Sequence, residues 1–126
     1  MRLLIDTHAF LWWRADSPKL AAEARRALLD DANEVLVSSA VAWEIVIKRA
    51  LGRLDFDGAV AAAIADEGFF NLAVTAAHVD EVARLPLHHR DPFDRLIIAQ
   101  ARIESLTLMT RDPRIRAYDG FAVLLA

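Results

Sequence analysis

Short apolar runs alternate with segments of helical pattern along the whole chain, and this alternation limits the folds that the chain can adopt. Buried strands are expected at residues 3–5, 35–37, 69–74, 106–109 and 121–125. Helical segments separate the first four runs, which favours parallel strands joined by right-handed crossovers. No linker, internal repeat or low-complexity tract interrupts the pattern. The sequence therefore predicts an α/β fold with a parallel sheet, in one domain that spans residues 1–126.

Capping signals indicate where the helices begin and end. Ser17-Pro18 and Asp91-Pro92 each place a good N-cap residue before a proline, which suits the first position of a helix. Gly52 marks the end of a helix that begins after Ser38-Ser39. The expected helices span residues 8–14, 17–28, 40–51, 57–68, 75–85 and 93–104. Residues 110–113 are expected to form a loop.

The composition disfavours several classes of protein. A net charge of −3 argues against a general nucleic-acid binder, although arginines are frequent after residue 84. The chain has no cysteine, so it forms neither disulfides nor thiolate metal sites. No segment has the roughly 18 uncharged apolar residues of a membrane span, and Asp6 and His8 interrupt the apolar N-terminus that a signal peptide would need. We therefore expect a cytoplasmic protein that has no membrane partner.

Four acidic residues stand where this layout would bring them together. Asp6 directly follows the first expected strand, and Asp112 lies just after the fourth. Glu44 lies in the helix after the second strand, and Asp94 lies in the first turn of the helix before the fourth strand. Ligands of open parallel sheets bind outside the carboxyl ends of the strands. Because clustered carboxylates repel one another without a cation, and Mg²⁺ and Mn²⁺ prefer oxygen ligands, the pattern predicts a divalent-metal site.

Several of these acids also have a simpler structural explanation. Asp6 and Asp91 are good N-cap residues for the helices that follow them. Glu44 stands four residues before Lys48, which is a favourable spacing for an ion pair within a helix. Asp112 would open a turn at the proline that follows it. The joint placement of the acids supports a site more strongly than any one of them does.

Four sequence blocks resemble the signature blocks of PIN-domain nucleases, and in particular those of the VapC-type toxins of bacterial and archaeal toxin–antitoxin pairs. The blocks are, in family order, LLIDTHAFLWW, SSAVAWEIVIK, HRDPFDRLIIAQA and LMTRD. The resemblance covers nearly the whole chain and implies a three-layer α/β/α sandwich with a twisted, mainly parallel sheet. It also implies a Mg²⁺- or Mn²⁺-dependent endoribonuclease that forms a homodimer and is inhibited by a cognate antitoxin protein.

The resemblance also assigns roles to single residues. The acidic pocket that binds the metal and performs catalysis would consist of Asp6, Glu44, Asp94 and Asp112. Asp91 would be an auxiliary acid, and Thr7 and Thr110 match hydroxyl positions that steady the acids or contact a phosphate. Arg95 in the third block and Arg111 in the fourth are expected to contact the substrate phosphate. No motif matches residues 114–120.

The chemistry follows from the ligands, but two other functions remain open. One or two ions held by Asp6, Asp94 and Asp112 would activate a water and stabilise the leaving oxygen of a phosphodiester. Glu44 would bind a second ion or orient the water. This hydrolysis needs no 2′-hydroxyl, so RNA as the substrate comes from the resemblance alone. The alternatives are a metal-dependent phosphatase with Asp6 as nucleophile, and a non-catalytic RNA-binding module with a PIN-like fold.

The remaining histidines and the tryptophans are expected to have lesser roles. A zinc hydrolase with an H-x-H pair after its first strand is disfavoured, because Phe10 stands where the second histidine would be. The phosphatase is also disfavoured, because its second acid would stand two residues after Asp6, where this chain has His8. His8 is expected near the site, and His88 and His89 are expected to be loop residues. A place in the core or at an interface is expected for Trp12, Trp13 and Trp43.

Overall fold

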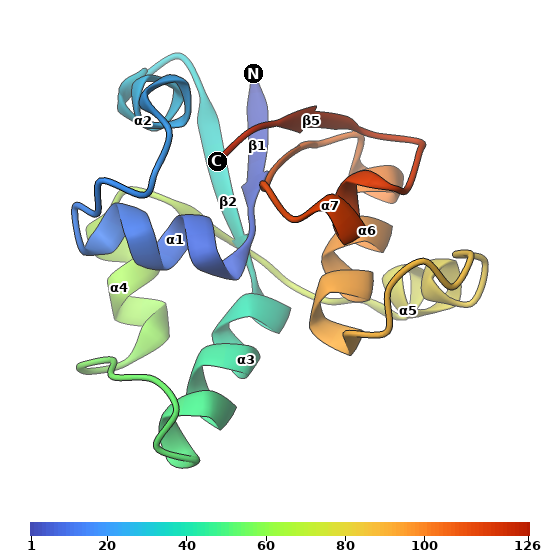
Figure 1. The fold of residues 1–126 in the computed structure, drawn as a ribbon, viewed down its shortest axis with the longest axis horizontal. Helices are drawn as coiled ribbons and strands as arrows, with labels where there is room; N and C mark the ends of the chain where they lie inside the picture. Colours follow the sequence, from blue (N-terminus) through green and yellow to red (C-terminus); the bar gives the residue numbers. More distant parts are fainter.

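The computed structural model describes residues 1–126 and shows five strands in one sheet (Figure 1). The strands are β1 (Arg2–Ile5), β2 (Glu34–Ser38), β3 (Phe70–Leu72), β4 (Thr107–Met109) and β5 (Ala122–Leu124). Their order across the sheet is β3-β2-β1-β4-β5, and every pair of neighbours is parallel. The prediction of an α/β fold with a mainly parallel sheet is confirmed.

Helices cover the sheet and connect its strands. They are α1 (Thr7–Arg14), α2 (Ala22–Leu29), α3 (Ser39–Ala50), α4 (Val60–Asp66), α5 (Ala76–Val82), α6 (Pro92–Glu104) and α7 (Pro113–Arg116). In Figure 1, α1 and α4 lie on one side of the strands and α5 and α6 on the other, as in a three-layer sandwich. Helix α3 contacts both α1 and α6 and lies beyond the end of β2. None of these helices has the length and apolar surface that crossing a bilayer demands.

The central strands are buried on both faces of the sheet. In β1, Leu3, Leu4 and Ile5 have no exposed surface. Ile97 and Ile98 of α6 belong to the same core. A short, continuous apolar run is typical of a parallel strand that helices cover on both sides. Asp6 is therefore the first polar residue after β1, at the point where the chain leaves the core.

Two helices begin later than the sequence predicts. The Ser17 hydroxyl oxygen accepts a hydrogen bond from the Lys19 N–H at 3.2 Å, and the Ser17 carbonyl accepts one from the Leu20 N–H. Ser17-Pro18 therefore forms a turn, and α2 begins only at Ala22. Helix α4 begins at Val60 and not at residue 57, because Gly58 has a left-handed backbone with φ of 76°.

The other differences concern short elements near chain reversals. Strand β3 starts one residue late because the Phe69 N–H still donates to the Ile64 carbonyl of α4, and its pairing with β2 ends at Leu72. Helix α5 ends at Val82, and residues 83–85 continue it only as turns. Residues 110–113 were expected to form a loop, but Asp112 caps the short helix α7 and Pro113 occupies its first turn. This is the aspartate–proline signature that also starts α6.

Ser105 offers a test of how α6 ends. This exposed residue has a left-handed backbone with φ of 54°, which side chains with a Cβ adopt at a cost and glycine does not. We expect Ser105→Gly to raise the free energy of unfolding by up to about 1 kcal/mol, because relief of the strain exceeds the entropy that glycine adds to the unfolded chain. Urea unfolding measures the change. Ser105→Ala keeps the Cβ and is the matched control; a gain in both variants would contradict the explanation.

Candidate functional site

The register between β1 and β4 places the ends of these two strands side by side. Ile5 pairs with Met109, and the Asp6 N–H donates to the Met109 carbonyl at 3.1 Å. Asp6 and Thr110 therefore leave the sheet at the same level. From β1 the chain continues to β2 on one side, and from β4 it continues to β5 on the other, so the strand order reverses here. Ligands of open parallel sheets bind at such a switch point.

A cavity of about 130 Å³ opens at this switch point, and all four predicted acids line it. Asp6 comes from the end of β1, Glu44 from α3, Asp94 from α6, and Asp112 from the N-cap of α7. The other lining residues are Thr7, His8, Lys48, Asp91, Arg114 and Ile115. The volume corresponds to about four water molecules. The cavity thus has room for a small ion with part of its hydration shell.

Asp6 caps α1 and faces the cavity at the same time. Its Oδ1 accepts a hydrogen bond from the Ala9 N–H at 2.8 Å, and the residue is only 5% exposed. Burial raises the pKa of Asp6, while the Thr110 hydroxyl and the Ala9 N–H act in the opposite direction. The structural explanation for Asp6 as an N-cap is therefore correct, yet it leaves a buried carboxylate at the cavity wall.

Glu44 is held by two neighbours on opposite oxygens. The Thr7 hydroxyl donates to Oε1, and the Lys48 ammonium donates to Oε2 at 2.6 Å. Glu44 is only 5% exposed, because helix α3 buries it at the cavity. Its contact with Lys48 is therefore not an ordinary ion pair on the protein surface. Thr7, expected to steady the acids or contact a phosphate, contacts an acid.

Asp94 lies near a histidine and two other acids. Its backbone N–H donates to Asp91 Oδ1 at 2.8 Å, which makes Asp91 the N-cap of α6, and its Oδ2 lies 2.7 Å from His89 Nε2. Burial raises the pKa of Asp94 to about 6. The hydrogen bond from His89 opposes this rise, whereas the charges of Asp91 and Glu44 add to it.

Asp112 is the most exposed of the four acids and carries its own cation. Arg114 Nε lies 3.2 Å from Asp112 Oδ1, and Arg114 Nη2 lies 3.1 Å from Oδ2. Partial burial acts to raise the pKa of Asp112, but the hydrogen bonds and charge of Arg114 hold it below the usual range. Thr110 Oγ1 accepts from the Asp112 N–H at 3.1 Å. Both threonines thus contact the acids.

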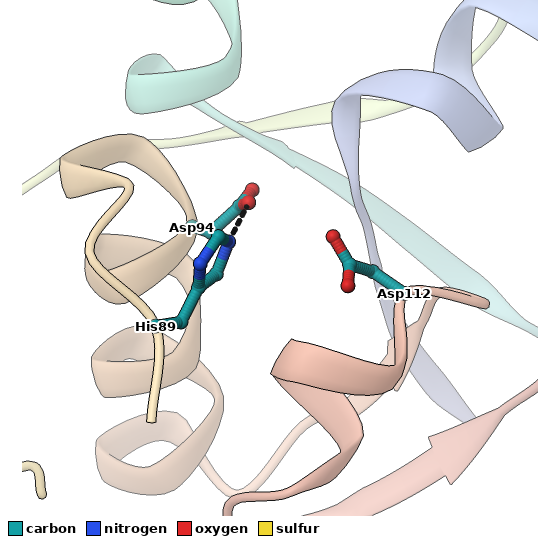
Figure 2. Close-up of side chains that lie close together, drawn as sticks. All are labelled: His89, Asp94 and Asp112. Atoms are coloured by element: carbon teal, nitrogen blue, oxygen red, sulfur yellow. Dashed lines mark hydrogen bonds and ion pairs between the residues drawn. The ribbon is translucent and has the colours of Figure 1, made fainter. Parts of the chain in front are cut away.

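Three residues at this site were not assigned to it from the sequence. Lys48 was noted only as an ion-pair partner, and Arg114 lies in a stretch without a motif, yet both line the cavity. The aspartate–proline signature at Asp112 predicts a helix start, and that turn brings Arg114 back to the carboxylate. His89 was expected to be a loop residue, but it is only 6% exposed and contacts Asp94. Figure 2 shows its ring beside Asp94, with Asp112 across from them.

The two arginines expected at the phosphate do not line this cavity. The Arg95 guanidinium donates to backbone carbonyls of residues 82–89 and to the Tyr118 hydroxyl. Arg111 donates to the carbonyls of Lys19 and Ala126, and its guanidinium carbon lies 4.2 Å from the ring centre of Trp12. Arg111 and Trp12 line a separate, more open hollow that also borders Asp6 and Asp112.

A sequence model of the PIN domain matches residues 3–121. The chain belongs to the PIN-domain family. In this PIN domain the matched region includes all four acids, both threonines, strands β2 to β4 and all of β1 except Arg2. No curated protein sequence matches the chain.

Solved structures share the fold of this PIN domain. VapBC2 from Rickettsia felis, bound to a DNA fragment from its promoter, aligns with a TM-score of 0.73 and 14% identity, over 99% of this chain and 98% of that one. DNA-bound VapBC from Salmonella typhimurium aligns with a TM-score of 0.68 and 15% identity, over 99% and 98%. The PIN domain endonuclease Utp24 aligns with a TM-score of 0.56 and 17% identity, over 99% and 84%. At sequence identities of 14–17%, these alignments show that the structures share a fold with this chain.

Proposed function

We propose that this PIN domain is a divalent-metal-dependent endoribonuclease that acts in the cytoplasm as the toxin of a toxin–antitoxin pair, with residues 1–126 forming one nuclease domain. The observation that carries the proposal is the convergence of Asp6, Glu44, Asp94 and Asp112 on one cavity at the switch point of the sheet. Membership of the PIN-domain family and the likeness to VapBC complexes and to an endonuclease support it.

The donor set suits a hard divalent cation such as Mg²⁺ or Mn²⁺. The four acids supply only carboxylate oxygens, which these ions prefer. The raised pKa values of Asp6 and Asp94 indicate negative charge that the protein alone compensates poorly. In our proposal Asp6, Asp94 and Asp112 hold the ion, and Glu44 binds a second one or orients the water. When bound, the cation would polarise the phosphodiester and lower the pKa of the attacking water.

The surrounding residues would position the acids and the substrate. Thr7 and Lys48 fix the two oxygens of Glu44, so its carboxylate keeps one orientation. Lys48 and Arg114 are the only lysine and arginine that line the cavity, so they are the cations nearest to a bound phosphate. We infer that Arg114, whose side chain is 65% exposed in its ion pair with Asp112, shifts from that carboxylate to the phosphate when the ion and the RNA bind.

Cleavage of a structured RNA, with single-stranded DNA and p-nitrophenyl phosphate tested alongside, distinguishes the candidate functions. We expect RNA cleavage with Mn²⁺ or Mg²⁺ that EDTA abolishes. Release of p-nitrophenol without RNA cleavage would identify a phosphatase. RNA binding without cleavage under any metal would identify a non-catalytic module. Cleavage of DNA but not RNA would retain the nuclease and reject the ribonuclease.

The toxin role has separate tests, because a nuclease need not be a toxin. We expect induced expression to arrest bacterial growth, and we expect a neighbouring gene that encodes a small protein with a DNA-binding N-terminus to relieve the arrest. We also expect the purified chain to elute as a homodimer, which light scattering after gel filtration measures. Unaffected growth at high expression of an RNA-cleaving protein would leave a nuclease that is not a toxin.

Protons and cations should compete for the buried acids of this cavity. The folded-state pKa of Asp94, about 6, lies above its usual value of 3.8. Its ionised form therefore destabilises the metal-free fold, by roughly 3 kcal/mol at most, fully above that pKa, and the effect disappears as the pH falls toward 4. The metal-free protein should thus gain stability from this group between about pH 7 and pH 4.

A bound cation compensates the same charge, so its effect should have the opposite pH dependence. We expect Mn²⁺ to raise the melting temperature strongly at about pH 7.5 and much less at about pH 5.5. Circular dichroism melts with Mn²⁺ and with EDTA measure both effects. Asp31→Asn, at an exposed position in the turn that precedes β2 and so away from the carboxyl ends of the strands, is the matched control for charge removal. Equal stabilisation by Mn²⁺ at the two pH values would contradict the competition.

A further inference from the structure

His89 lies between α5 and α6, in a segment without regular structure, yet its side chain is only 5% exposed. Buried polar groups in proteins nearly always have a hydrogen-bond partner. The partner of His89 is Asp94, whose Oδ2 lies 2.7 Å from Nε2. Because an ionised carboxylate only accepts, we assign the proton of the neutral ring to Nε2, which donates to Asp94. The bond thus requires one tautomer of His89.

The backbone around His89 is held from two sides. The Tyr118 hydroxyl oxygen accepts from the backbone N–H groups of His88 and His89, at 3.1 and 3.0 Å. Arg95 Nη1 donates to the His89 carbonyl at 3.2 Å and to the Tyr118 hydroxyl at 3.0 Å. Tyr118 follows α7 and Arg95 belongs to α6, so two separate elements fix this one loop position.

The consequence for Asp94 is a fixed carboxylate. His89 occupies Oδ2, and the Asp94 backbone is anchored by its N–H bond to Asp91. No hydrogen bond within the protein uses Oδ1. Figure 2 shows Asp94 and Asp112 on opposite sides of the space beside the His89 ring, and side-chain donor atoms of all three residues lie within 4.8 Å of one another. Asp94 therefore keeps one carboxylate oxygen for the cavity.

We propose that His89 is a positioning residue that orients Asp94 toward the divalent cation, and that Tyr118 and Arg95 hold His89 in place for this task. The inference rests on the proposed function, in which Asp94 is a metal ligand. Outer hydrogen bonds orient the carboxylates that bind metals, and loss of such a partner costs about 10- to 100-fold in metal affinity or activity. His89 itself does not bind the ion through Nε2, because Asp94 already uses that atom.

A pair of amide variants separates positioning from simple space filling. The amide nitrogen of Gln reaches about as far along the side chain as Nε2 of His, whereas that of Asn is too short. The quantity to measure is the Mn²⁺ dissociation constant of the RNA-free protein, by calorimetry and by electron paramagnetic resonance. We expect His89→Asn to weaken Mn²⁺ binding about 10- to 100-fold, and His89→Gln to remain close to wild type. Arg90→Gln, at the exposed position that follows His89, is the control and should not change binding.

Circular dichroism shows whether His89→Asn folds. If it does not, a second variant, Tyr118→Phe, tests the proposal. Tyr118→Phe leaves all residues that line the cavity unchanged and removes only the hydroxyl that holds the loop. We expect it to fold and to bind Mn²⁺ more weakly than wild type. Unchanged Mn²⁺ affinity in Tyr118→Phe would show that the Tyr118 hydroxyl does not help His89 to orient Asp94, and would contradict that part of the proposal.

Three outcomes would overturn the inference. The first is Mn²⁺ binding by a folded His89→Asn that equals wild type. The second is a spin-echo signal from a histidine nitrogen bound directly to Mn²⁺, which His89→Gln abolishes, because His89 would then be a ligand. The third is the Nδ1–H tautomer of His89 in nitrogen-15 spectra of the metal-free protein at alkaline pH. Absence of Mn²⁺ binding by the wild type would instead overturn the proposed function together with this inference.

Discussion

Asp94→Asn is expected to abolish Mn²⁺-dependent RNA cleavage while the protein stays folded. The amide keeps an oxygen that accepts from His89, so the local packing survives, but its NH₂ group meets a cation with the wrong polarity. Because loss of a residue that only orients a ligand costs about 10- to 100-fold, loss of a ligand should lower the cleavage rate by more than about a hundredfold. Cleavage under excess Mn²⁺ and unfolding in urea measure the two effects.

The same substitution tests whether the loss is one of chemistry or of structure. Removing a buried charge with a raised pKa should leave the metal-free protein at least as stable as wild type above about pH 6. Asp6→Asn should behave alike, because asparagine also caps a helix and can accept from the Ala9 N–H. Asp31→Asn, an exposed aspartate in the turn before β2, should keep full activity. Wild-type cleavage by either cavity variant under Mn²⁺ would reject the assignment of the acids.

Much of this fold could be predicted from the sequence because the relevant signals are local. The three apolar residues of β1, and the similar runs of β2 and β4, can be buried only in the middle of a sheet. Once those strands are parallel, residues that follow them meet at one edge. That is why Asp6 and Asp112 could be placed together before any contact was known. The parallel arrangement of β1 and β4 was sufficient for this prediction.

The remaining features depend on contacts that a local pattern does not contain. Ser17-Pro18 and Asp91-Pro92 carry the same signal, yet the first forms a turn and only the second starts a helix. The Tyr118 hydroxyl, which accepts a hydrogen bond from the backbone N–H of His89, stands 29 residues away. A dipeptide pattern cannot encode such a partner, so the sequence correctly places His89 in a loop but does not reveal its contact with Asp94.

The role of Arg95 also depends on contacts that the local sequence does not reveal. Replacing Arg95 should strongly lower the free energy of unfolding. Residues 83–91 lack regular structure, so their carbonyl groups need partners other than a helix or sheet. Arg95 provides them, because its two terminal nitrogens donate to the carbonyls of Val82, Leu85, Pro86 and His89 at 3.1–3.4 Å. Hydrogen bonds from charged donors contribute about 1.5–3 kcal/mol each, and they are not additive within one group.

We therefore expect Arg95→Met to lower the free energy of unfolding by about 2–4 kcal/mol, as measured by urea denaturation. Arg95→Lys should recover little of this, because an ammonium lacks the planar fork that reaches several carbonyls at once. Arg90→Met, at an exposed position in the same loop, is the matched control and should change stability by less than about 0.5 kcal/mol. The expectation that Arg95 contacts a phosphate makes the opposite prediction: weaker RNA binding at unchanged stability. An unaltered unfolding curve together with a raised KM would therefore return Arg95 to the substrate and contradict its role in the loop.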